Sequence, residues 1–361
     1  MTNPETHWLS RTECTVMRGV AILAIVLHNY CHWLRGIVRE NEFTFNISNA
    51  HGMWQQLLHP DGLLPLHLFS FLGHYGMPLF VLLSGYGLAS KYGREEHLPV
   101  WRFVRYHYLK LFKMMIVGFI CFTVVDAMTA GSWHYNVAQI VGQLLMINNF
   151  YDQPDRNIWP GPFWFFGLML QLYVVYRLLL YRRHWGWTVG LMAVCTVAQL
   201  FMDPEGENLN YWRYNFMGGM LPFGLGLLFA RYGNKVMLVN LTFGSFLMSW
   251  VVCSFFIVSA SGSFYTWVIV PALVCYASVY FIKTVSTLPL PRLRARIGYV
   301  LGWLGNVSAA LFVIHPAIRK VFITVSRQGD IYTGLLLYAI ASLGAAWLVM
   351  KLMRHIPNPK L

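Results

Sequence analysis

The sequence has few charged residues for its length. Only 11% of its 361 residues are charged, whereas 57% are hydrophobic; a soluble protein carries about 25% charged residues. The hydrophobic residues recur in long runs along the whole chain, which indicates an all-α polytopic membrane protein surrounded by the lipid bilayer. The formal net charge of +13 is not gathered in a solvated basic domain, so nucleic acid is not expected as a partner.

Cysteine motifs and processing signals are also lacking. The 6 cysteines show no CxxC or CxxH spacing, so neither a disulfide framework nor a zinc site is expected, and no metal is assigned. No small-residue cleavage pattern follows the first apolar run, 16–34, which predicts a retained helix rather than a signal peptide. No internal repeat, low-complexity tract or soluble insertion interrupts the pattern. Residues 1–361 are therefore expected to form a single transmembrane domain.

What the chain has instead is a series of apolar runs long enough to cross the hydrocarbon core, which takes about 20 residues. The expected spans are 16–34, 66–90, 111–129, 162–181, 186–202, 214–230, 236–259, 264–282, 298–318 and 331–353. Counting the shorter run 137–150 as a span would place Arg182 and Arg183 outside, against the positive-inside bias. The sequence thus predicts ten transmembrane helices with both termini cytoplasmic, and a short extracytoplasmic or re-entrant helix at 137–150. Three loops are then external: 35–65, 130–161 and 203–213.

The first run carries ionisable residues, which are costly inside a membrane and therefore candidates for function. In RGVAILAIVLHNYCHW (18–33), His28 lies ten residues after Arg18, which is about 15 Å along a helix and near the expected bilayer midplane. His32 shares a face with His28, and Arg18 is closer in angle to Asn29 and His32. We expect His28, His32 and Arg18 to be catalytic. Two plainer interpretations stay open: a neutral His28 ring bonded between helices, and an Arg18 side chain that reaches the headgroups.

Three other runs place polar or aromatic side chains within the expected membrane domain. FLGHYGMPLFVLLSGYGLAS contributes His74 and Ser84, and LGNVSAALFVIHPAIRK contributes Ser308 and His315 on one helical face. PFWFFGLMLQLYVVY opens with Trp164. Ser84 could equally bond a backbone carbonyl one turn back, and a tryptophan at a helix start is often an interfacial anchor.

These segments, in this order, resemble the membrane acyltransferase 3 family, integral-membrane O-acyltransferases that modify cell-envelope and secreted glycans. The similar segments are MRGVAILAIVLHNY, GMPLFVLLSGYGL, WRFVRYHYLKLFK, FWFFGLMLQLYVVY and NVSAALFVIHP. The family commonly places its histidine one residue further from the arginine, where this chain has Asn29. Many members also carry a glutamate where this chain has Met169. The enterobacterial-common-antigen O-acetyltransferase-like subset lacks that glutamate too, and the chain resembles that subset.

The resemblance implies transfer of an acyl group, with acetyl as the first expectation, from cytoplasmic acetyl-CoA or another acyl-CoA to a glycan or glycolipid hydroxyl. The enzyme would lie in the inner (cytoplasmic) membrane and hold no tightly bound cofactor. Donor-binding residues would be Arg18, Arg102, Arg105, Ser84, His315 and Ser308. Acceptor-side residues would be His74, Asn29 and Trp164. A histidine suits this chemistry because it can take the hydroxyl proton or accept the acyl group itself.

Two alternatives explain part of the same pattern. A transporter or flippase for a small anion or a lipid-linked sugar would also place histidine and arginine inside the membrane, but the sequence shows no matching halves. A non-catalytic membrane scaffold would leave the histidines unexplained. The sequence indicates neither the acceptor nor an oligomeric state.

Overall fold

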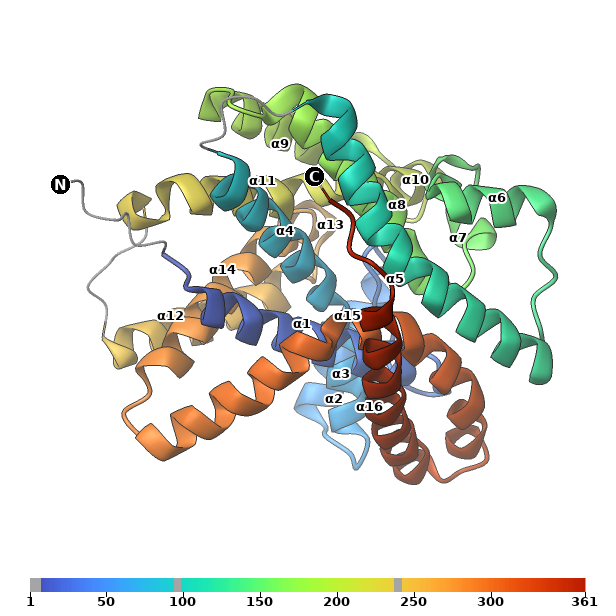
Figure 1. Cartoon of the computed structure of the whole chain (residues 1–361). Coiled ribbons are helices and arrows are strands. Elements are labelled where there is room, and N and C mark those ends of the chain that lie inside the picture. Colours follow the sequence, from blue (N-terminus) through green and yellow to red (C-terminus); the bar gives the residue numbers. More distant parts are fainter. Residues whose placement is uncertain (1–7, 94–98, 237–241, 361) are drawn as a thin grey trace.

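The computed structural model describes residues 8–93, 99–236 and 242–360, with the backbone alone for 234–236. Within these residues every regular element is a helix (Figure 1). The prediction of an all-α fold is therefore confirmed.

Eight helical segments are long and apolar enough to cross a membrane. They are α1 (Arg11–Cys31), α3–η1–α4 (Leu64–Tyr92), α5 (Val100–Met128), η3–α8–η4 (Gly161–Leu180), α12 (Phe243–Ala260), α14 (Val270–Thr287), α15 (Pro291–Arg327) and α16 (Ile331–His355). Within the composite segments, the parts are α3 (Leu64–Leu72), η1 (Gly73–Tyr75), α4 (Gly76–Tyr92), η3 (Gly161–Phe163), α8 (Trp164–Val175) and η4 (Tyr176–Leu180). The remaining two expected spans correspond to shorter or less apolar helices: α9 (Trp185–Val197) with η5 (Ala198–Phe201), and α11 (Phe216–Val236). The count of ten and the cytoplasmic position of the termini stay predictions.

The short helices lie between these long segments. They are α2 (Ile47–Leu58), α6 (Val137–Leu145), η2 (Asn148–Phe150), α7 (Pro154–Asn157), α10 (Glu207–Tyr214) and α13 (Phe264–Trp267). The run 137–150 forms α6 and η2, and α6 has only 9 residues, too few to cross the hydrocarbon core. Asn136 and Gln139 cap its start reciprocally. The expectation of a short helix there is confirmed.

Helix α1 lies inside the bundle and packs against α3, α4, α14 and α15. Its crossing with α15 depends on two glycines. A Cβ atom on Gly19 would lie 1.9 Å from the Leu301 carbonyl oxygen, and one on Gly305 would lie 1.9 Å from that of Thr15. Small residues allow helix backbones to approach this closely, so the two glycines set the α1–α15 distance.

A second close approach brings the turn η1 against the middle of α1. A Cβ atom on Gly73 would lie 2.6 Å from the Ala24 carbonyl oxygen and 2.7 Å from the Cβ of His28. The helix narrows to a 3₁₀ turn at this point before α4 continues. The irregular turn therefore places His74 directly beside His28.

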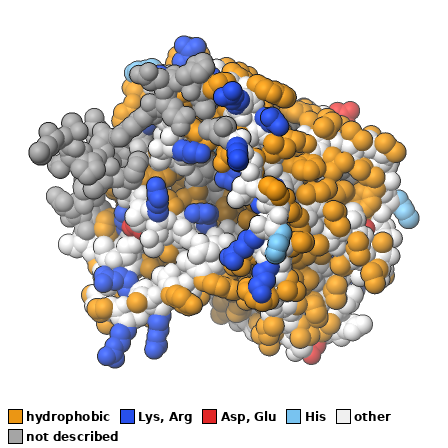
Figure 2. Space-filling model, in the orientation of Figure 1, with side chains coloured by type: hydrophobic (Ala, Val, Ile, Leu, Met, Phe, Trp, Pro, Cys, Tyr) orange, Lys and Arg blue, Asp and Glu red, His pale blue; other side chains and the backbone are white. Residues whose placement is uncertain are grey.

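Basic side chains mark one face of the bundle. Figure 2 shows Lys and Arg gathered over the middle and lower left of that face, whereas its right side is mostly hydrophobic. Segments expected to be cytoplasmic also bond to each other: Lys113 Nζ donates to the Ile356 carbonyl at 2.6 Å, and Lys283 pairs with Glu13 at 2.9 Å. The predicted topology places these bonded segments together on the cytoplasmic side.

Candidate active site

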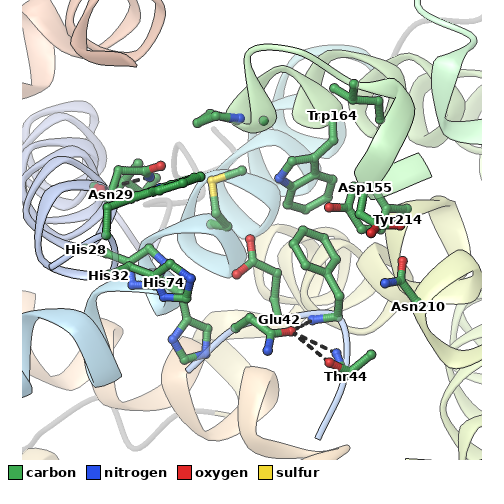
Figure 3. A pocket seen from close by; sticks show the side chains of 18 of the residues that line it. His28, Asn29, His32, Glu42, Thr44, His74, Asp155, Trp164, Asn210 and Tyr214 are labelled. Atoms are coloured by element: carbon green, nitrogen blue, oxygen red, sulfur yellow. Dashed lines mark hydrogen bonds between the residues drawn. The ribbon is translucent and has the colours of Figure 1, made fainter. Parts of the chain in front are cut away.

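A cavity of about 400 Å³ lies where α1 ends (Figure 3). Residues from α1, η1, α8 and α15 line it together with residues from all three loops expected to be external. The polar and charged lining residues are His28, Asn29, His32, Asn41, Glu42, Thr44, His74, Asp155, Asn210 and Arg319, and the aromatic ones are Trp33, Phe43, Trp159, Trp164 and Tyr214. The fold thus gathers remote polar segments around the residues of the first helix.

Three imidazole rings form one side of this cavity. The ring centroid of His28 lies 5.0 Å from that of His32 and 5.6 Å from that of His74. His28 and His32 are one turn apart on α1 and at its C-terminal cap, and His74 comes from η1. In Figure 3 they lie on one side, with Glu42 in the middle of the view and Asp155, Tyr214 and Asn210 opposite.

The hydrogen bonding of His28 fixes its proton. Its Nδ1 lies 2.8 Å from the Ser70 carbonyl oxygen. A carbonyl oxygen can only accept a hydrogen bond, so in the neutral ring Nδ1 carries the proton and Nε2 keeps its lone pair. The ring is 9% exposed and lines the cavity. His28 is thereby arranged as a proton acceptor or a nucleophile.

Two glutamates of the loop after α1 have perturbed acidities. Burial raises the pKa of Glu42 to about 7, against the opposing effect of Arg213. The carboxyl of Glu42 faces the cavity (Figure 3). Burial also raises the pKa of Glu40 to about 8. Near neutral pH both side chains therefore hold a substantial protonated fraction.

Arg213 holds this loop in place. Its Nη1 donates to the Glu42 carbonyl at 2.9 Å, its Nε donates to Gln199 Oε1 at 2.7 Å, and its guanidinium lies 3.7 Å from the ring centroid of Trp267. Burial lowers the pKa of Arg213 to about 10, which still leaves the group charged at neutral pH. The loop that carries Glu42 is thus fixed to α10 and α13.

A buried amide network sets the aromatic wall. Asn149 Nδ2 donates to the carbonyls of Trp164 at 2.9 Å and of Tyr214 at 2.6 Å. Asn215 Nδ2 donates to the Asn149 carbonyl at 2.9 Å, and Gln171 Nε2 donates to Asn215 Oδ1 at 2.9 Å. Satisfied networks of this kind rigidify their surroundings, so two of the cavity's aromatic residues are held from behind.

Of the predicted site residues, the cavity collects His28, Asn29, His32, His74 and Trp164. Arg18 does not line it. Its side chain is exposed, and it bonds within its own helix to the Cys14 carbonyl at 3.4 Å and to Thr15 Oγ1 at 3.3 Å. Arg102 and Arg105 are exposed near the start of α5. Their assignment to the donor stays a prediction.

The remaining three predicted residues do not line this cavity, and each forms a hydrogen bond elsewhere. Ser84 bonds to the hydroxyl of Tyr173. Ser308 Oγ donates to the Gly305 carbonyl at 2.8 Å. His315 is completely buried, and its Nδ1 donates to the Leu311 carbonyl at 3.1 Å while Nε2 has no partner among the described residues. The partner of Ser84 is therefore a side chain rather than the backbone carbonyl one turn back, and the assignment of both serines to the donor stays a prediction.

Sequence reasoning missed three charged residues that line the cavity: Glu42, Asp155 and Arg319. Arg319 carried a usable signal, because it follows His315 by four residues and so shares its helical face. Glu42 lies in the loop after α1 and Asp155 in the short helix α7, and no pattern in the sequence connected either of them with the histidines. Among the described residues, no group of three or more His, Cys, Asp or Glu is placed to hold a metal ion.

Eight long apolar helices around a cavity lined with imidazole and carboxyl groups are typical of a multi-pass membrane protein with a polar site between its helices. The chain belongs to the acyltransferase 3 family: the family model, described as an acyltransferase domain, matches residues 12–351. Searches among curated proteins and among solved structures give no significant match. The protein is therefore a membrane-bound acyltransferase, and its likeness to the enterobacterial-common-antigen subset stays a prediction.

Proposed function

We propose that the protein is an O-acyltransferase that moves an acyl group, acetyl in the first instance, from cytoplasmic acyl-CoA to a hydroxyl of a glycan or glycolipid at the outer side of the cytoplasmic membrane. The single observation that carries this proposal is the state of His28. Its Nδ1 proton is held by the Ser70 carbonyl, and the same ring lines a cavity built largely from expected external loops.

In the proposed reaction His28 is the general base. The acceptor hydroxyl oxygen attacks the thioester carbonyl carbon while its proton moves to His28 Nε2. The tetrahedral intermediate then collapses, the carbon–sulfur bond breaks, and the CoA thiolate takes the proton from His28. The products are an ester and free CoA, with the ring returned to its neutral form. Direct acylation of Nε2 is the alternative course.

The cavity lining supports a sugar as the acceptor. Trp33, Trp164 and Tyr214 offer aromatic faces, and Asn41, Glu42 and Asp155 offer hydrogen-bonding groups. Small-molecule sites commonly combine apolar and aromatic walls with a few well-placed polar groups. His74 and Asn29 belong to the same cavity, in keeping with their assignment to the acceptor side.

Arg18, Arg102 and Arg105 are proposed to meet the CoA phosphates, because a guanidinium matches phosphate oxygens. All three are exposed and lie on segments expected to be cytoplasmic. A transporter would use such groups too, but membership of an acyltransferase family favours the enzyme.

The test is acyl transfer by the purified protein in nanodiscs, given acetyl-CoA and a panel of glycans, with free thiol and the esterified glycan both measured. We expect His28→Ala to lose transfer by more than about 100-fold, which is the usual scale for a general base. The matched control is His59→Ala, because His59 is an exposed histidine outside the cavity. Activity retained by a folded His28→Ala protein would assign the base elsewhere. A folded wild-type protein that transfers no acyl group from any donor would refute the enzyme proposal.

A further inference from the structure

The cavity contains a buried cation, Arg319, that is not paired with a carboxylate in the part of the chain that the structure describes. Arg319 is 7% exposed, lines the cavity beside the histidines, and forms no ion pair with a carboxylate among the described residues. A charge buried without a partner is costly. An anion that enters the cavity would offset this cost by pairing with the guanidinium.

The guanidinium of Arg319 is hydrogen-bonded through Nη1, whereas its other nitrogens have no hydrogen-bond partner among the described residues. Nη1 donates to the backbone carbonyl of Asn29 at 3.2 Å and to its Oδ1 at 3.4 Å. The guanidinium carbon lies 4.8 Å from the ring centroid of Trp33. The donors on Nε and Nη2 make no hydrogen bond to the described residues. Arg319 thus presents oriented, unused donors in a cavity that also contains His28.

Asn29 links the guanidinium of Arg319 to His28. Asn29 follows His28 directly in α1, so the residue that fixes the guanidinium is attached to the residue that carries the proposed base. Arg319 lines the same cavity as His28 and His32. An acyl carbonyl that reaches His28 Nε2 would therefore lie within the field of the guanidinium.

We propose that Arg319 is a catalytic residue that stabilises the oxyanion of the tetrahedral intermediate; this inference rests on the proposed function. When the acceptor hydroxyl adds to the thioester carbonyl, the carbon–oxygen π electrons move to oxygen, and the hydroxyl proton moves to His28. The resulting O⁻ accepts hydrogen bonds from the free N–H groups of Arg319. On collapse those electrons return to form the ester carbonyl, and the thiolate leaves. Donors fixed in advance where charge develops lower the barrier without a cost of reorganisation.

The closing experiment measures kcat and the KM of each substrate for Arg319→Gln and Arg319→Lys. We expect Arg319→Gln to lower kcat by about 100- to 1,000-fold, the scale for loss of an oxyanion donor, while both KM values stay within about threefold of wild type. Arg319→Lys should keep more activity, because it keeps the charge but loses the planar geometry. The matched control is Arg327→Gln, because Arg327 is an exposed arginine on the same helix that donates to the Trp33 carbonyl at 3.1 Å; it should keep wild-type kcat.

A second variant separates this role from a structural one. Asn29→Asp puts a carboxylate where Asn29 Oδ1 now lies, 3.4 Å from Arg319 Nη1, so it neutralises the guanidinium without removing it. We expect a kcat at least about tenfold lower, the scale of a weakened charge–charge interaction of about 1.4 kcal/mol. The melting temperature is measured alongside, because aspartate also loses the bond from Asn29 Nδ2 to the Ile25 carbonyl at 3.1 Å.

The outcomes separate the inference from the proposed function. If the wild-type protein is active and folded Arg319→Gln has the same kcat, the inference about Arg319 is overturned and the proposed function stands. A raised acceptor KM with unchanged kcat would also overturn the inference, because it would show that Arg319 binds an anionic group of the acceptor. If Arg319→Gln does not fold, wild-type kcat in Asn29→Asp overturns the inference. A folded wild-type protein without transfer would overturn both.

Discussion

At the scale of single residues, the loop after α1 concentrates unusual chemistry. Glu40 is fully buried, its Oε1 accepts a hydrogen bond from Asn41 N at 2.9 Å, and its Oε2 has no partner among the described residues. A buried carboxyl of this kind is most stable in its protonated form. Folding therefore favours the protonated form of the Glu40 carboxyl.

Glu40 should make stability depend on pH. Burial raises its pKa from 4.5 to about 8, so between these values the folded protein binds more protons than the unfolded one. The stabilisation is complete below pH 4.5 and is lost as pH rises through about 8. We expect the melting temperature of the wild type to fall by about 2–5 °C across this range, and that of Glu40→Gln to fall less. Exposed Glu205 gives the control variant, Glu205→Gln. An equal fall in Glu40→Gln and wild type would contradict the assignment.

Glu42 should affect binding of the acceptor rather than stability alone. Burial raises its pKa to about 7, and a carboxylate accepts hydrogen bonds from hydroxyl groups more strongly than a neutral acid does. The acceptor KM of the wild type should therefore decrease as pH rises through about 7. In Glu42→Gln this change should disappear while the KM of acetyl-CoA stays unaffected. Steady-state kinetics at several pH values measure both, and a pH-dependent acceptor KM in Glu42→Gln would assign the ionisation to another group.

At the scale of helices, the contact between α1 and α15 positions the site. Helix α1 contributes His28, and α15 contributes Arg319. The distance between the two helices depends on glycines whose Cβ atoms would collide with the opposite backbone. Backbone atoms cannot rotate away as a flexible side chain can, so the tolerance is small.

Gly305→Ala should therefore destabilise the protein, whereas Gly302→Ala on the same helix should not. A Cβ on Gly305 would lie 1.9 Å from the Thr15 carbonyl oxygen, while one on Gly302 meets no atom within 4 Å. We expect a cost of about 1–3 kcal/mol for the first variant, as for other overpacked sites, and no loss for the second, because alanine favours the helix. Melting temperatures in detergent compare the two. Equal values would show that α1 and α15 can separate without cost.

At the scale of the whole molecule, the sequence predicted most of the bundle and about half of the site. The apolar runs marked the helices because burial in lipid requires them to be continuous, and the spacing of His28, Asn29 and His32 within one helix identified a shared face. The cavity wall opposite them could not be predicted. Glu42 reaches it from the loop after α1 and Asp155 from the short helix α7, and no periodicity links such distant segments. Ser308 and His315 stood out in their motif, yet neither lines the cavity, and both bond to carbonyls of their own helix.

The predicted topology can be tested by labelling. In a cysteine-free background, we expect Glu205→Cys to react with an impermeant maleimide from outside, and His184→Cys and Arg292→Cys to react only after the membrane is opened. All three positions are exposed. Labelling of positions 184 and 205 from the same side would show that α9 does not cross, and would reduce the count of ten.

The hydrogen bond between His28 and the backbone of Ser70 affects how the site tolerates substitutions at position 70. The acceptor is a main-chain oxygen, and the hydroxyl of Ser70 takes no part in it and has no partner of its own among the described residues. Because Ser70 is completely buried, a replacement as small as alanine should leave the peptide oxygen in place and keep the bond to the imidazole. A large side chain would instead shift the main chain of α3 and with it the orientation of the ring.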